Sequence, residues 1–412
     1  MLEGYRVLDL SNEKGYLCGK ILSDLGAEVI KIEPPGGDLG RNIGPFADDI
    51  PDPEKSFYWF AYNLGKKSIT LNLESKDGKE IFRRLLKVSD FVIESFSPGY
   101  LDSLSLGYSE ISRINPGIIM VSISPFGQSG PHKDYKAPDI VLMAMGGSMY
   151  INGEPGRRPL NFSFPMAYLH AASEATVGAL IASYYRGITG EGQHVDQSAQ
   201  QSVAVTLHNA VETWDIAKKK IKRSGNLWSV RPPPYVGTKV LFTCKDGYVT
   251  FPIMAGLVAA RFYPPLIEWM KTDGFCVDAV SNVKWDEIDE ANFPKDLQEQ
   301  FVGLLEQFFS RHTKQELYEG AAQRRILLYP VSSVQDIWED SQLKFRNFWE
   351  NIYHPELETV VSYPRPCAKI LESEVPERPS PPTIGRNNQE IYERLIGLSR
   401  DALIILKQAG VI

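Results

Sequence analysis

The chain has 412 residues, of which 43% are hydrophobic and 23% charged, and its formal net charge is −7. These values are typical of a globular protein with a large core, and the length predicts two domains. The acidic balance excludes a strongly basic surface, so we expect no nucleic-acid partner.

The N-terminal stretch shows no basic segment followed by an apolar one, and no run of about 18 apolar residues occurs. We therefore expect a cytoplasmic protein with no membrane partner. Its four cysteines are far apart and form no C-x-x-C pair, which argues against a zinc site and a disulfide framework. We expect no bound metal and a reducing compartment.

The chain begins with a predicted strand at residues 6–10, a helix at 16–25 and a strand at 28–32. The turn after the first strand reads Ser-Asn-Glu-Lys-Gly and lacks the G-x-G-x-x-G of a dinucleotide site. Further strands at 69–73, 91–94 and 118–123 alternate with helices at 78–87 and 108–114. This alternation predicts an α/β fold with a mainly parallel sheet, whose ligands lie at the carboxyl ends of the strands.

A long, mostly apolar helix is predicted over residues 167–185, and its first half is rich in small residues such as Ala171, Ala172 and Gly178. Small side chains let another backbone or a ligand approach closely. A second helical stretch over 198–219 has apolar residues at helical spacing, which predicts a core stripe or, alternatively, an oligomer contact. These residues are Val203, Leu207, Ala210, Val211 and Trp214. The basic run at 218–223 is either a solvated helix end or a phosphate or partner site.

Residues 231–234, Arg-Pro-Pro-Pro, predict a connection between domains. A hairpin with an Asp-Gly turn is predicted over 240–252, and helices at 296–309 and 313–322 complete a smaller α+β domain. A terminal amphipathic helix carries Ile391, Leu395 and Ile396. The predicted division is 1–225 for the first part of the large domain, 226–328 for the small domain and 329–412 for the return.

The segment Gly178-x-Leu180-x-Ala182, followed by Arg186 and Thr189-Gly190-x-Gly192-Gln193, resembles the signature of the class III CoA-transferases. This is the family of formyl-CoA transferase and carnitine CoA-transferase. The stretches 31–38 (KIEPPGGD) and 122–131 (SISPFGQSGP) also resemble family motifs. The resemblance implies a Rossmann-like large domain, an inserted small domain and a dimer of two chains interlocked like linked rings.

In that family the long helix opens with an aspartate, which attacks an acyl-CoA thioester and carries the acyl group as a mixed anhydride. Counting back without a gap places Tyr168 at this position. A phenol has a reference pKa near 10 and would form an ester, so Tyr168 cannot replace the aspartate. Glu174 lies about 240° further round the helix axis, which favours a polar helix contact over a role as substitute nucleophile. We therefore predict no catalytic residue in this chain.

The resemblance implies a coenzyme A thioester as substrate and no permanently bound cofactor. The related acyl-CoA racemases use a His-Asp pair, and their histidine aligns with Pro138. His132 and His170 are nearby, but a lone histidine is more often structural than an acid-base catalyst. The positions implied to contact CoA are Lys136, Arg41, Leu71, Phe96, Ser97, Lys14 and Gly15.

A retained scaffold beside a lost nucleophile predicts a subunit of a heteromeric CoA-transferase, whose sister chain carries the aspartate. The family's enzymes of the succinyl-CoA:benzylsuccinate type, which act in anaerobic aromatic degradation, have such a subunit. One alternative is a self-sufficient homodimer with an unconventional nucleophile. Another is a CoA-thioester-binding protein without catalysis.

Overall fold

The computed structural model describes residues 1–228, 237–289, 293–366, 371 and 378–412. The chain forms two compact units. Unit 1 comprises Met1–Ser148, Phe162–Leu207 and Gln342–Ile412, and unit 2 comprises Met149–Asn161 and His208–Ser341. The three-part domain division drawn from the sequence stays a prediction.

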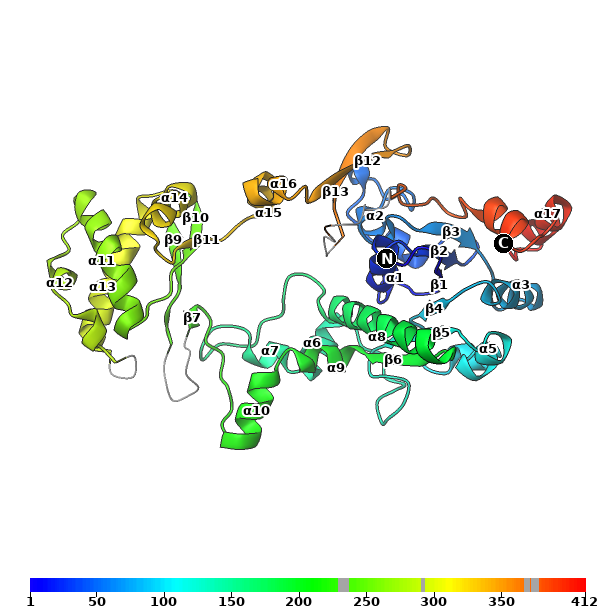
Figure 1. Cartoon of the computed structure of the whole chain (residues 1–412), viewed down its shortest axis with the longest axis horizontal. Coiled ribbons are helices and arrows are strands. Elements are labelled where there is room, and N and C mark those ends of the chain that lie inside the picture. Colours follow the sequence, from blue (N-terminus) through cyan, green and yellow to red (C-terminus); the bar gives the residue numbers. More distant parts are fainter. Residues whose placement is uncertain (229–236, 290–292, 367–370, 372–377) are drawn as a thin grey trace. The chain divides into compact units, whose positions relative to one another are not determined.

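Unit 1 is built on a six-stranded sheet in which every pairing is parallel (Figure 1). The strand order is β3-β2-β1-β4-β5-β6. Strands β1 to β3 follow one another toward one edge of the sheet and β4 to β6 toward the other, so the order reverses between β1 and β4. This is the Rossmann-like order, and it confirms the predicted α/β class. The strands are β1 (Arg6–Asp9), β2 (Glu28–Glu33), β3 (Lys67–Thr70), β4 (Phe91–Glu94), β5 (Ile119–Ser124) and β6 (His194–Ser198).

Helices cover both faces of this sheet, as its almost wholly buried central strands require. On one face α3 (Lys76–Leu86), α5 (Tyr108–Ile114) and the π-helix η5 (Glu390–Leu395) share a core with the strands. On the other face α8 (Ala167–Thr189) packs against β5, β6 and α1 (Tyr16–Asp24). The buried residues of α8 are mainly alanines, and a Cβ at Gly178 would lie 2.7 Å from Val195 Cγ1. The predicted close approach along this helix is therefore confirmed.

The remaining elements of unit 1 are short or lie near its ends. They are η1 (Leu39–Asn42), η2 (Ala47–Asp49), α2 (Phe57–Asn63), α4 (Tyr100–Ser103), α6 (Asp139–Met145), α9 (Ala199–Val205), the antiparallel pair β12 (Trp349–His354) and β13 (Thr359–Pro364), and α17 (Arg400–Gln408). Two further helices, α7 (Ser148–Ile151) and α16 (Ser341–Phe345), span the points where the units join.

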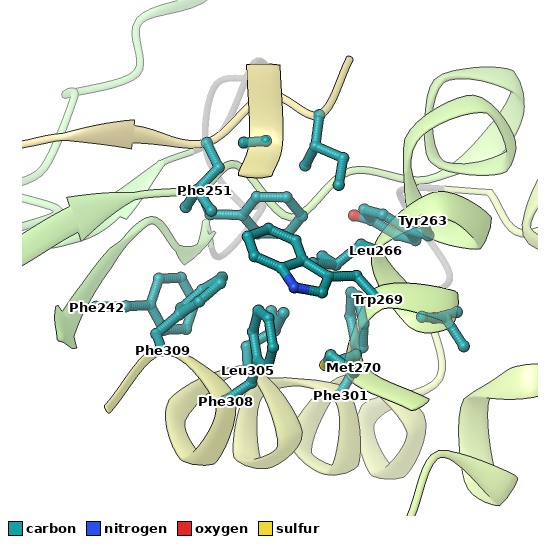
Figure 2. Packing of buried hydrophobic residues seen from close by; sticks show 14 of the residues in the cluster. Phe242, Phe251, Tyr263, Leu266, Trp269, Met270, Phe301, Leu305, Phe308 and Phe309 are labelled. Carbon is teal, nitrogen blue, oxygen red and sulfur yellow. The ribbon is translucent and has the colours of Figure 1, made fainter. Parts of the chain in front are cut away.

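Unit 2 has its own core, formed by aromatic and aliphatic side chains from a hairpin and two long helices (Figure 2). The hairpin pairs β9 (Leu241–Cys244) with β10 (Gly247–Thr250), as the Asp-Gly turn predicts. The helices are α11 (Gly256–Thr272) and α13 (Lys295–Ser310). The smaller elements are α10 (His208–Ala217), β7 (Leu227–Trp228), β8 (Thr238–Lys239), α12 (Asp278–Ser281), η3 (Trp285–Glu287), α14 (Lys314–Arg324), β11 (Tyr329–Pro330) and α15 (Val334–Glu339).

Two expectations about helices were wrong. The stretch 198–219 is not one helix, because α9 and α10 are separated at Thr206 and Leu207, where the second segment of unit 1 ends. Its apolar residues do not form a core stripe, since Val203 is buried whereas Val211 and Trp214 are exposed. Helix α11 was not predicted from the sequence, and it continues through adjacent Pro264 and Pro265 although proline usually disfavours a helix interior.

Some expectations concern residues outside those described. They are the expected connection between domains at residues 231–234 and the thiol of Cys367. The three described cysteines, Cys18, Cys244 and Cys276, are free thiols. In the described part of the chain, no group of His, Cys, Asp and Glu side chains could hold a metal ion. No described helix is both long and apolar enough to cross a membrane.

Candidate functional site

A pocket of 530 Å³ lies at the point where the strand order of unit 1 reverses. The loop after β1 contributes Glu13 and Lys14 to its wall, and the loop after β4 contributes Phe96 and Ser97. Ligands of open parallel sheets bind at such a position, outside the carboxyl ends of the strands. The volume suits a small organic ligand or part of a larger one.

Tyr168, in the first turn of α8, lines the same pocket. Its hydroxyl donates a hydrogen bond of 2.7 Å to the backbone carbonyl of Ala137. Burial, with the nearby charges of Glu13 and Asp139, raises the pKa of the phenol well above its usual value. The phenol is therefore neutral near pH 7 and is already engaged with the backbone.

A second hydrogen bond joins the same two segments. The Asp139 carboxylate accepts a hydrogen bond of 2.7 Å from the backbone N–H of Ala167, at the start of α8. This satisfies one of the amide donors that a helix leaves unpaired at its first turn. Asp139 therefore helps to hold the start of the helix.

The other charged groups of the pocket are less constrained. The ammonium groups of Lys14, Lys133 and Lys136 form no hydrogen bond or ion pair with any described residue. The same is true of the Glu13 carboxylate, which is half-buried and lies near enough to Tyr168 to raise its pKa. Three free cations give the pocket the means to bind an anionic group, such as a carboxylate or a phosphate.

The structure brings four of the seven predicted CoA-contacting residues together in this pocket, namely Lys14, Phe96, Ser97 and Lys136. Gly15 is buried next to them in sequence, where a Cβ would lie 2.5 Å from that of Ser11. Leu71 directly follows β3 and is buried in the core.

The predicted CoA contact Arg41 is fully buried and does not line this pocket. Its guanidinium binds both carboxylate oxygens of Glu33, at 2.6 and 2.8 Å, and lies 3.7 Å from the ring centre of Trp59. It also pairs with Glu54. These contacts give Arg41 a structural function within unit 1.

Two of the side chains considered from the sequence, Glu174 and His132, have local contacts. Glu174 accepts a hydrogen bond of 3.1 Å from Gln197 Nε2, which confirms the predicted polar contact. His132 packs against the rings of Phe126 and Tyr135. Neither His132 nor His170 lines the 530 Å³ pocket.

A second, polar pocket of 330 Å³ shares Ser97, Pro98 and Lys133 with the first. Ser122 Oγ lies in it, 2.8 Å from His194 Nε2. Glu94 is paired in register with Ser122, and burial raises the pKa of its carboxyl to about 7. Neither Glu94 nor Glu13 was predicted from the sequence as a site residue. An available signal was that these residues lie at the ends of neighbouring parallel strands.

A pocket beside the point where the strand order of a parallel sheet reverses is typical of the class of α/β proteins that bind a small ligand there. The chain belongs to the CoA-transferase family III, whose model matches residues 2–388. Enzymes of this family transfer CoA between carboxylic acids and use acyl-CoA thioesters as substrates without a bound cofactor.

Among its relatives, the chain is 31% identical to a succinyl-CoA:(R)-benzylsuccinate CoA-transferase subunit of Thauera aromatica, over 94% of this chain and 92% of that one. It is 32% identical to a formyl-CoA:oxalate CoA-transferase of Streptomyces coelicolor, over 100% of this chain and 99% of that one. A solved structure of a CAIB/BAIF family protein from Brucella suis is similar with a TM-score of 0.81 at 26% identity, over 96% of this chain and 99% of that one.

Proposed function

We propose that this chain is the subunit of a heteromeric class III CoA-transferase that lacks the nucleophilic aspartate, and that a homologous sister chain supplies it. The observation that carries this proposal is the state of Tyr168, which occupies the position that the resemblance assigns to the aspartate. Its hydroxyl is committed to the Ala137 carbonyl and its pKa is raised by burial. A neutral, hydrogen-bonded phenol is a poor nucleophile toward a thioester.

The proposed substrates are succinyl-CoA and an aromatic succinate such as benzylsuccinate. The name of the Thauera relative states a reaction of this kind for that protein. The pocket of this chain has an aromatic wall that suits an aryl group, formed by Tyr58, Tyr62, Phe96, Phe164 and Tyr168. Its three free lysines suit carboxylates.

The proposed assembly is an interlocked dimer of two chains, each with a large and a small domain. Support comes from a face of α8 on which four large apolar side chains, spaced at three or four residues, are each more than half exposed. They are Val177, Ile181, Tyr184 and Ile188. Such a stripe on one helix face is typical of a surface that another chain covers. Among the relatives, the names of two identify them as subunits.

Co-expression tests the subunit proposal. The gene would be expressed alone and together with a homologue that has aspartate at the position of Tyr168, and CoA transfer from succinyl-CoA to benzylsuccinate would be measured. We expect activity only in the co-expressed complex, with two chains of equal amount in native mass spectrometry. Full activity from this chain alone would contradict the proposal.

One observation favours a second candidate, a self-sufficient CoA-transferase. Glu13 presents a carboxylate to the pocket without a hydrogen bond or ion pair to any described residue. A carboxylate can attack the thioester carbonyl, release the CoA thiolate and hold the acyl group as an anhydride.

Hydroxylamine distinguishes the two candidates, because it attacks the enzyme-side carbonyl of the anhydride, releases the acyl group as its carboxylate and leaves a stable hydroxamate on the residue that carried it. If Glu13 carries the acyl group, this chain, purified without a sister chain, gains a hydroxamate at Glu13 when it is incubated with succinyl-CoA and hydroxylamine. The Glu13→Gln variant gains none. If the sister chain carries it, the label appears only on the sister's aspartate. The matched control is Glu3→Gln, whose side chain is exposed and outside the pocket.

A further inference from the structure

The segment of residues 133–138 forms one wall of the 530 Å³ pocket and carries two of its three free lysines, Lys133 and Lys136. Its own backbone gives it little support. Lys133 and Tyr135 donate backbone hydrogen bonds to Gly130 and His132, but the N–H groups of Lys136 and Ala137 donate none to a described residue. A segment of this kind keeps one conformation only if other contacts hold it.

Tyr168 provides such a contact. Ala137 is buried, and a buried carbonyl that has no hydrogen-bond donor is unfavourable. Among the described residues, the Tyr168 hydroxyl is the donor to this carbonyl, at 2.7 Å. Directly after the segment, the Asp139 carboxylate accepts a hydrogen bond from the N–H of Ala167, so two hydrogen bonds join the first turn of α8 to Ala137 and Asp139.

An aspartate at residue 168 could not make this contact. An ionised carboxylate has no proton to donate, and a carbonyl oxygen only accepts. The aspartate side chain is also much shorter than that of tyrosine. The hydrogen bond to Ala137 is therefore available to this chain because a phenol stands where the resemblance places a carboxylate.

We infer that Tyr168 is a positioning residue, which fixes the segment 133–138 so that Lys133 and Lys136 face the pocket and bind an anionic ligand without covalent chemistry. The ligand class, a CoA thioester or its free acid, rests on the proposed function. The positioning of the segment 133–138 by Tyr168 does not depend on the proposed function. With a phenol in place of a carboxylate, residue 168 supports ligand binding and takes no part in covalent chemistry.

The test compares the full-length protein with Tyr168→Phe, which removes only the hydroxyl. Hydrogen-deuterium exchange reports the backbone amides of Lys133 and Tyr135, which donate hydrogen bonds, and calorimetry reports the Kd of CoA and, separately, of succinate. We expect faster exchange in this segment and an affinity for at least one of the two ligands that is weaker by about three- to tenfold. Tyr168→4-aminophenylalanine, which restores a donor, is expected to reverse both effects.

Tyr5→Phe is the matched control, since Tyr5 lies outside the pocket and its hydroxyl makes no hydrogen bond with a described residue. Unchanged exchange and affinity in Tyr168→Phe would overturn the inference. So would faster exchange with unchanged affinity, or the absence of CoA and succinate binding by the unmodified protein. A lack of CoA transfer with every sister chain, together with the expected exchange and binding results, would overturn only the proposed function.

Discussion

At the scale of single residues, unit 1 buries several ionisable groups whose partners decide their charge. Glu94 is 4% exposed, and its carboxyl lies near Ser122 and accepts a hydrogen bond from the backbone N–H of Phe96. Burial dominates over these contacts and raises its pKa to about 7, with further contributions from Asp102 and Asp196. The Arg41 guanidinium makes a buried bidentate pair with the Glu33 carboxylate. The two sites lead to different predictions.

We predict that Glu94 makes the protein less stable as the pH rises from about 4.5 to about 7. The folded chain holds the Glu94 proton more tightly than the unfolded chain, so its contribution is complete below the unfolded pKa and is lost as the pH passes the folded pKa. The expected loss is roughly 3 kcal/mol, and Glu94→Gln removes it. Urea unfolding between pH 4.5 and 8 measures the difference between the two proteins.

Taking the difference in unfolding free energy between wild type and Glu94→Gln at each pH cancels the contributions of other titrating groups. One of these is His194, whose pKa is lowered by burial. Glu3→Gln, at an exposed site, is expected to keep the wild-type profile. Parallel pH profiles for wild type and Glu94→Gln would show that Glu94 titrates normally.

We predict that Arg41→Lys lowers the free energy of unfolding by about 2–4 kcal/mol, because an ammonium cannot make the two parallel hydrogen bonds to Glu33. Chemical denaturation measures this change. Arg113→Lys is the control, since Arg113 pairs with Glu110 on the exposed side of α5 and is expected to change stability by less than about 0.5 kcal/mol. Lost CoA affinity with unchanged stability would instead favour Arg41 as a ligand contact.

At the scale of elements, helix packing in unit 2 depends on where glycines stand. On α14, a Cβ at Gly320 would lie 2.3 Å from the Trp269 ring of α11, so this glycine allows the two helices to approach. On α13, a Cβ at Gly303 would have no neighbour within 4 Å. Both glycines are inside helices, where alanine has the higher intrinsic propensity. The two sites therefore separate packing from propensity.

We predict that Gly320→Ala destabilises unit 2 by about 1–3 kcal/mol, because the added methyl group displaces Trp269. Gly303→Ala is the matched variant and is expected to stabilise by up to about 1 kcal/mol through helix propensity. The change in the unfolding midpoint, followed by tryptophan fluorescence, distinguishes the two. Equal effects of both substitutions would contradict the packing argument.

At the scale of the whole molecule, the exposed stripe on α8 is a surface that the proposed assembly would bury. We predict that Ile181→Glu weakens association with a second chain, because it places a charge at the centre of the apolar stripe. Sedimentation of the purified protein is expected to show a shift from the assembled species to smaller ones. Ile181→Leu keeps the apolar character and is expected to leave assembly intact. Intact assembly in Ile181→Glu would remove α8 from the interface.

Much of this organisation was determined by the sequence. The alternation of apolar strands and helices predicted the parallel sheet, because each strand must be covered on both faces and short connections allow few topologies. Strand β4 and helix α5 were predicted at their observed bounds, Phe91–Glu94 and Tyr108–Ile114. The motif around Gly178 and Arg186 was sufficient to predict the family, which the match over residues 2–388 confirms.

Other features were decided only by tertiary structure. Periodicity could not show that Val211 and Trp214 are exposed, because the chain passes from unit 1 to unit 2 after Leu207 and the expected helix is broken there. Helix α11 was not predicted: proline disfavours a helix interior, but packing of Tyr263 and Trp269 into the core maintains the helix through Pro264 and Pro265. The pocket is the clearest case: Glu13, Lys136 and Tyr168 are distant in sequence, and they meet because parallel strands place their loops at one edge.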